Sequence, residues 1–104
     1  MKLLSINYIP DKKIEALGMV KGTIVQTKNV GRDFMAGIKT LVGGEIVGYT
    51  ETLNEARQIA IKRMVDEAKE LGADAVIDVK YGSSTVMTGA AEVIAYGTAV
   101  KILD

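Results

Sequence analysis

The sequence contains no cysteine and no histidine among its 104 residues. The first absence excludes disulfides, thiolate metal sites and cysteine nucleophiles. The second removes the most common general base and the most common ligand of transition metals. Any acid–base chemistry or metal binding by this chain therefore has to use carboxylates, other oxygen ligands or methionine.

An excess of charge of one sign is also missing, because 13 Lys and Arg balance 13 Asp and Glu. Nucleic-acid-binding domains usually carry a basic surplus on one face, and the only dense basic cluster here is Lys12–Lys13. One Phe and four Tyr offer few platforms for base stacking. We therefore expect no nucleic-acid partner.

Long apolar runs are absent too. No window approaches the ~20 apolar residues of a membrane span. The first apolar stretch is too short for a signal peptide, since Asn7 and Asp11 follow it closely. We expect a cytoplasmic protein with no membrane partner.

Apolar residues are nevertheless plentiful, at 48% of the chain. A chain of this length forms one domain, 1–104, and buries only about 60–70% of its unfolded surface. A thin core leaves apolar surface to be covered, so we expect a homo-oligomer.

The first part of the chain predicts strands. Residues 2–9 favour a short edge strand, and Pro10-Asp11 is typical of a turn. Residues 14–28 are rich in β-branched side chains, with Gly18 and Gly22 indicating bulges, a bend or a junction between two strands.

Two helices follow in the prediction. Asn29 can cap a short helix over about 30–42, which Gly43-Gly44 would end. The sequence from Thr52 to Glu55 fits a capping box, and Gly72 ends the long amphipathic helix that it opens. Its apolar stripe comprises Leu53, Ala56, Ala60, Met64, Ala68 and Leu71.

Residues 75–81 and 91–102 predict two further strands, joined by a loop over 82–90 into an antiparallel hairpin. One face of the last strand carries small residues, which allow a helix or another subunit to pack closely: Val93, Ala95, Gly97 and Ala99. The predicted fold class is α+β, a mostly antiparallel sheet with the short helix and the long amphipathic helix on one face.

The sequence offers no recognisable catalytic residue and no metal ligand set. Residues 43–50 come close to a phosphate-binding loop, but Tyr49 stands where that loop needs Lys. The glycines are better explained as ending one helix and starting the next. Carboxylates outside the long helix show no spacing that specifies an acid–base pair, and the serines have no histidine to activate them.

Arg57 and two pairs of polar residues at the predicted helix starts are the remaining candidates for a site. The pairs are Arg32 with Asp33, and Tyr49 with Glu51. If the two helix starts meet in space, these residues form a ligand site; capping, ion pairing or a subunit contact is the alternative interpretation.

An ordered set of motifs resembles a known family over about residues 10–103. The motifs are Gly18-Met19-Val20-Lys21-Gly22, Asn29-Val30-Gly31-Arg32-Asp33-Phe34, Val42-Gly43-Gly44, Tyr49-Thr50-Glu51, Ala56-Arg57-Gln58-Ile59-Ala60, Gly72-Ala73-Asp74-Ala75-Val76 and Tyr96-Gly97-Thr98-Ala99-Val100. Together they resemble the YbjQ-like family of small bacterial and archaeal proteins, labelled heavy-metal-binding.

The resemblance implies a dodecin-subunit-like fold assembled as a homopentamer, with no established enzyme activity and no cofactor. It maps the family's Arg-Asp pair onto Arg32 and Asp33 and its Tyr-x-Glu onto Tyr49 and Glu51, without assigning them a role. The chain is thus expected to be a non-enzymatic oligomer that binds a small ligand or ion between subunits. The alternative is a divalent or heavy metal held by oxygen ligands from several subunits.

Overall fold

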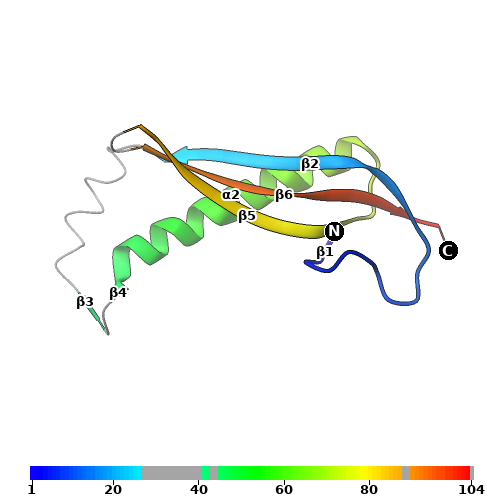
Figure 1. Cartoon of the computed structure of the whole chain (residues 1–104), viewed down its shortest axis with the longest axis horizontal. Coiled ribbons are helices and arrows are strands. Elements are labelled where there is room, and N and C mark those ends of the chain that lie inside the picture. The colour runs from blue at the N-terminus through cyan, green and yellow to red at the C-terminus, as the bar shows by residue number, and fades with distance from the viewer. Residues whose placement is uncertain (27–40, 43–44, 88–89, 104) are drawn as a thin grey trace.

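The computed structural model describes residues 1–26, 41–42, 45–87 and 90–103. Three long strands and one long helix dominate it (Figure 1). In chain order the elements are β1 (Lys2–Leu3), β2 (Ile14–Gln26), β3 (Leu41–Val42), β4 (Glu45–Ile46), α2 (Val47–Glu70), β5 (Ala75–Met87) and β6 (Ala90–Ile102).

The main sheet has the strand order β1-β5-β6-β2, and it is mixed. β6 pairs antiparallel with both β5 and β2, whereas β1 runs parallel to β5. β3 and β4 form a separate two-stranded sheet. Hydrogen bonds from Leu4 N to Val76 O and from Val79 N to Leu4 O extend the contact between the N-terminal segment and β5.

The predicted fold class was therefore wrong. The sheet is mixed rather than mostly antiparallel, and the described part of the chain holds one helix instead of a short and a long one. Residues 41–42, which the sequence assigned to the short helix, form β3, and 30–40 lie outside the described residues. Hydrophobic periodicity does not specify the direction in which two strands pair, which is why the parallel β1 was missed.

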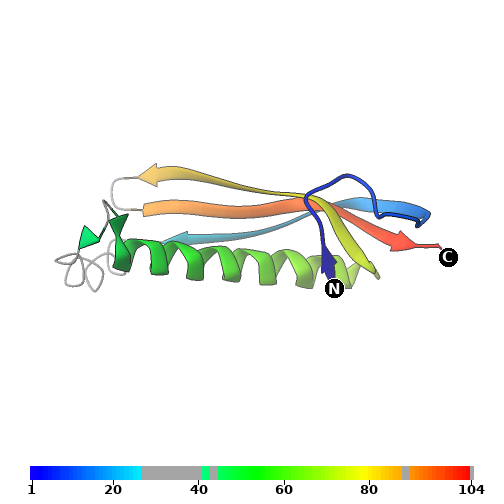
Figure 2. The ribbon, with the colours of Figure 1, turned by 90° about the horizontal axis from the view of Figure 1, so that it is seen from below.

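The helix α2 packs on one face of the sheet (Figure 2). Its fully buried side chains recur every four residues and meet the small-residue face of β6 together with Val20 of β2. They are Ala56, Ala60, Met64 and Ala68, against Val93, Ala95 and Ala99. The small side chains of β6 thus receive the chain's own helix, one of the two partners that the sequence allowed.

The helix ends in a Schellman motif around Gly72. Its φ of 77° lies in the left-handed region, Gly72 N donates to Lys69 O, and Ala73 N donates to Ala68 O. The predicted end of the helix is correct. The start is not, because α2 begins at Val47 and the predicted capping box lies inside it.

As far as the described residues go, the opposite face of the sheet is covered at one end. There the N-terminal segment folds back, and Ile9 packs against Ala75, Ile77 and Val100. The molecule is consequently thin and long, 53 × 28 × 17 Å. Among the described residues, no helix combines the length and the apolar character that crossing a bilayer requires.

Candidate functional site: the α2–β5 groove

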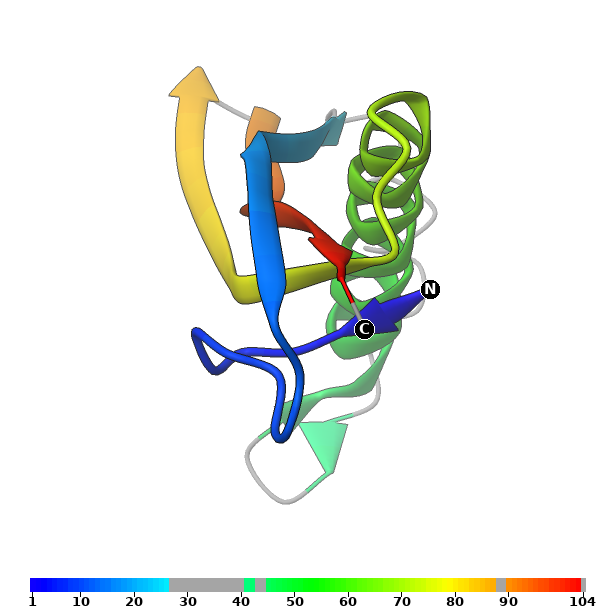
Figure 3. The same ribbon diagram turned by 90° about the vertical axis from the view of Figure 1, so that its right-hand side faces the viewer.

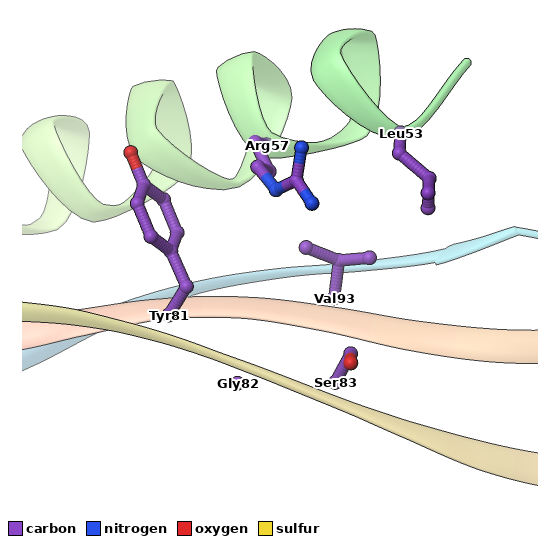
Figure 4. A pocket seen from close by; sticks show the side chains of 6 residues that line it. All are labelled: Leu53, Arg57, Tyr81, Gly82, Ser83 and Val93. Atoms are coloured by element: carbon purple, nitrogen blue, oxygen red, sulfur yellow. The ribbon is translucent and has the colours of Figure 1, made fainter. Parts of the chain in front are cut away.

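The helix α2 lies mainly over β2 and β6, so the outer half of β5 is left uncovered. Figure 3, which looks along the strands, shows α2 on one side of the sheet and β5 displaced from it. Between α2 and β5 lies a hollow of about 220 Å³, the α2–β5 groove. Its lining residues are Leu53, Arg57, Tyr81, Gly82, Ser83 and Val93 (Figure 4).

The strand β5 places two hydroxyl-bearing side chains in the groove. Successive side chains of a strand point to opposite faces, so Tyr81 and Ser83 share the face toward α2. The sequence placed residues 82–84, as a turn or a bulge, in the loop over 82–90. In the structure, however, Gly82 pairs with Ile94 and Ser83 with Val93, and the strand continues to Met87. This extension brings Ser83 into the groove.

The helix contributes the charge. Arg57 lies one turn after Leu53 and is exposed, and its guanidinium extends over the side chain of Val93 (Figure 4). Its Nη1 donates a hydrogen bond of 3.0 Å to Asn54 Oδ1. The ion pairs between described side chains all lie elsewhere, so none of them neutralises Arg57.

The groove therefore has an apolar floor, Leu53 and Val93, and a polar rim with one permanent cation and two hydroxyls. None of its six described lining residues is acidic. A guanidinium presents several N–H donors in a planar fork that matches carboxylate and phosphate oxygens. The arrangement suits a small anion with an apolar part and disfavours a metal cation.

Among the residues that the structure describes, the two groups with a shifted pKa, Asp66 and Lys80, lie outside the groove. A hydrogen bond from Lys62 lowers the pKa of Asp66, at an Nζ–Oδ2 distance of 2.9 Å. A hydrogen bond to Asp78 raises the pKa of Lys80, at 3.0 Å. Both pairs are exposed, so we assign them no role in binding.

Oxygen-ligand metal binding finds no support within one chain. Across residues 1–26, 41–42, 45–87 and 90–103, no three acidic side chains gather as a metal site requires. A metal site in this protein would need ligands from more than one copy or from residues beyond those ranges.

Of the predicted site residues, Arg32 and Asp33 lie outside the described residues. Tyr49 and Glu51 belong to the first turns of α2, about two turns before Arg57. Whether the two pairs meet stays a prediction. Arg57 was singled out from the sequence, but Tyr81 and Ser83 were missed, because one was taken as an ordinary strand residue and the other as part of a turn.

These features define a small protein with a mixed sheet and a shallow, anion-suited groove between that sheet and its one described helix. The chain belongs to the YbjQ-like family: the family model described as "Putative heavy-metal-binding" matches residues 1–103. The resemblance noted in the sequence is thereby confirmed.

Relatives support this assignment over the whole chain. A "UPF0145 protein" of Clostridium novyi is 60% identical over 103 residues, covering 99% of this chain and 100% of the relative. Another, from Helicobacter hepaticus, is 57% identical over 104 residues and covers both chains fully. Neither name denotes an enzyme.

The fold also resembles a solved structure. The crystal structure of a protein of unknown function from Pediococcus pentosaceus aligns with a TM-score of 0.63 at 17% identity, covering 99% of this chain and 98% of that one. At this identity the likeness concerns the fold alone.

Proposed function

We propose that this chain is a non-enzymatic, self-associating protein that binds a small organic anion in the α2–β5 groove. The observation that carries the proposal is Arg57, a cation with no described acidic partner, at the rim of a hollow that also holds the hydroxyls of Tyr81 and Ser83. A carboxylate or phosphate group would accept hydrogen bonds from the guanidinium of Arg57, and the hydroxyls of Tyr81 and Ser83 provide further donors along the groove.

The size of the groove limits the ligand. Pockets for drug-sized molecules span about 300–1,000 Å³, and this hollow measures about 220 Å³. It fits one anionic group with a compact apolar body, which Leu53 and Val93 would contact. A second copy of the chain would supply the missing wall and remove the bound group from water.

Self-association is supported by the shape of the subunit. Its radius of gyration is 16.6 Å, whereas a compact domain of this length has about 13 Å. Within the described ranges α2 is the one helix, and it cannot cover both faces of a sheet whose long strands have 13 residues each. Five copies is the number that the family resemblance implies, and the mass of the purified protein tests it.

The anion site is tested by replacing Arg57. Inorganic phosphate and benzoate serve as probes, titrated into the wild type, Arg57→Gln, Arg57→Lys and the matched control Lys62→Gln, and binding is followed by amide chemical shifts. Hydrogen bonds to charged groups contribute about 1.5–3 kcal/mol, so Arg57→Gln should weaken binding at least about tenfold. Arg57→Lys should retain part of the affinity, and Lys62→Gln all of it. Equal affinities of wild type and Arg57→Gln would refute the site.

A second candidate function rests on the family description, which names heavy metals. Carboxylates repeated around a symmetry axis can supply the six to eight oxygen ligands that hard cations take. Elemental analysis and calorimetry with calcium, magnesium and zinc test this alternative. The metal-binding alternative predicts that the protein takes up metal in a fixed ratio and that Arg57→Gln leaves this ratio unchanged. Absence of metal uptake would refute it.

A further inference from the structure

The strand β5 has two parts with different surroundings. Its first residues are covered by the N-terminal segment, because Lys2 pairs with Ala75 and Leu3 with Val76. Farther along, Asp78 N donates to Ile6 O. The outer part of β5, Tyr81–Met87, pairs with β6 on one side and has no described strand on the other.

This outer part is unusually bare. Tyr81, Val86 and Met87 are 52%, 51% and 67% exposed, and the residues between them are exposed or half-buried. The segment Tyr-Gly-Ser-Ser-Thr-Val-Met contains no charge and no proline. Natural edge strands usually carry such residues, a bulge that twists the edge away, or a covering element, because an unguarded edge pairs with other chains. Of these devices, the described structure gives Tyr81–Met87 only a register irregularity between Thr85 and Met87.

The other edge of the sheet shows how this protein guards a strand. On β2, Lys21 N donates to Glu67 Oε1 of α2 at 3.3 Å, and Arg63 Nη1 of α2 donates to Thr23 O. Two side chains of α2 thus form hydrogen bonds with backbone groups of β2 at the middle of this edge. β2 also carries the charge of Lys21. A bulge does not distinguish the two edges, because β2 has one between Ala16 and Gly18 and β5 has an irregularity between Thr85 and Met87.

We infer that the outer half of β5 is a strand-addition site for a second copy of this chain. The inference rests on the self-association proposed above and names its surface. A second copy is favoured as the occupant for two reasons. The net charge is zero, so identical chains do not repel one another at long range. The subunit is also longer and thinner than a compact monomer.

The position of this edge links assembly to the groove. Tyr81 and Ser83 line the groove and belong to the bare segment, so a strand docked on β5 would lie beside the bound anion. A two-fold pairing of β5 with β5 produces even-numbered assemblies, whereas an odd number such as five requires a different strand of the next copy to face β5.

A charge placed on the edge tests the proposal. Val86→Lys is compared with Met19→Lys, the same kind of change at a 76%-exposed position of the guarded strand β2. The mass of each protein is measured by light scattering at micromolar concentration, with circular dichroism as the check of folding. Val86→Lys should reduce the mass to that of a smaller species, and Met19→Lys should keep the wild-type mass.

Hydrogen exchange of the wild type supplies a readout that does not depend on a variant folding. In the assembled protein, amides within 81–87 should exchange at least tenfold more slowly than in protein diluted until it dissociates. A monomeric wild type would refute self-association itself, and protection of this segment in a monomer would assign the edge to the same chain. The edge assignment alone would be refuted if Val86→Lys kept the wild-type mass and the amides of 81–87 were unprotected in the assembled protein. Anion binding is tested separately, by the substitutions of Arg57.

Discussion

Replacing Gly22 by alanine is the sharpest test of how α2 lies on the sheet. A Cβ atom at Gly22 would overlap the backbone oxygen of Ala60 and the backbone nitrogen of Met64, and it would lie 2.8 Å from the Cβ of Arg63. Backbone atoms cannot rotate away as a side chain does. The helix would have to move off β2, which would loosen the contacts of Ala60 and Met64 with the core.

The expected cost follows from two opposing effects. Overpacking costs about 1–3 kcal/mol and occasionally more, and two backbone collisions place Gly22→Ala at the upper end. Alanine also restricts the unfolded chain more than glycine does, which stabilises the folded state by about 0.4–1 kcal/mol. A net destabilisation of about 2 kcal/mol lowers the melting temperature of a domain of this size by about 8–16 °C.

The assay is thermal and urea unfolding followed by circular dichroism, at two protein concentrations because assembly makes the melting temperature concentration-dependent. Gly82→Ala is the matched control. Its new Cβ would meet only side-chain atoms, Ile94 Cγ2 at 3.1 Å and Tyr96 Cε1 at 4.0 Å. The side chain of Ile94 would have to shift slightly, so the cost should stay at or below about 1 kcal/mol, the lower end of overpacking. Equal stability of Gly22→Ala and Gly82→Ala would contradict the predicted collision between β2 and α2.

Three further outcomes are expected. Met64→Ala, which empties the largest fully buried side-chain position, should cost about 2–5 kcal/mol in urea unfolding; a cost below 1 kcal/mol would contradict the buried position. Gly72→Ala should cost about 1 kcal/mol because its φ of 77° disfavours a side chain, and Gly72→Asn should cost less; equal values would argue against the left-handed end of α2. The carboxyl of Asp66 should titrate below its ordinary pKa, and Lys62→Gln should raise that pKa again in an NMR titration. Because the folded-state pKa is the lower one, its stabilising effect is present above the unfolded-state pKa and is lost as the pH falls through the folded-state pKa; an unchanged pKa in Lys62→Gln would remove the assigned cause.

Local signals in the sequence predicted local features well. Pro10-Asp11 forms the expected turn, with Asp11 at a φ of 62° and Lys12 N donating to Ile9 O. Gly18, predicted to mark an irregularity, lies at a bulge of β2 with a φ of 144°. In both cases the backbone conformation depends on neighbouring residues, so a short stretch of sequence is sufficient.

Predictions that required two distant segments were less successful. Gly82, Ser83 and Ser84 have the composition of a turn, but pairing with β6 keeps them extended, and tertiary contacts override weak local preference. The same error removed Ser83 from the candidate site. Tyr49 and Glu51 were selected because they precede a predicted helix start, a choice that depended on the wrong starting residue.

By itself the sequence determined what the chain lacks, where α2 ends and to which family the chain belongs, because composition, glycine conformation and motif order are properties of the chain alone. Tertiary structure decided that β1 runs parallel to β5, that α2 covers β2 and leaves β5 bare, and that Arg57 faces Tyr81 and Ser83 across the groove. Those arrangements depend on which surfaces pack together, and Arg57 is separated from Tyr81 by the rest of α2 and the start of β5. The hydrophobic periodicity of one segment does not indicate which residues of another segment will lie next to it.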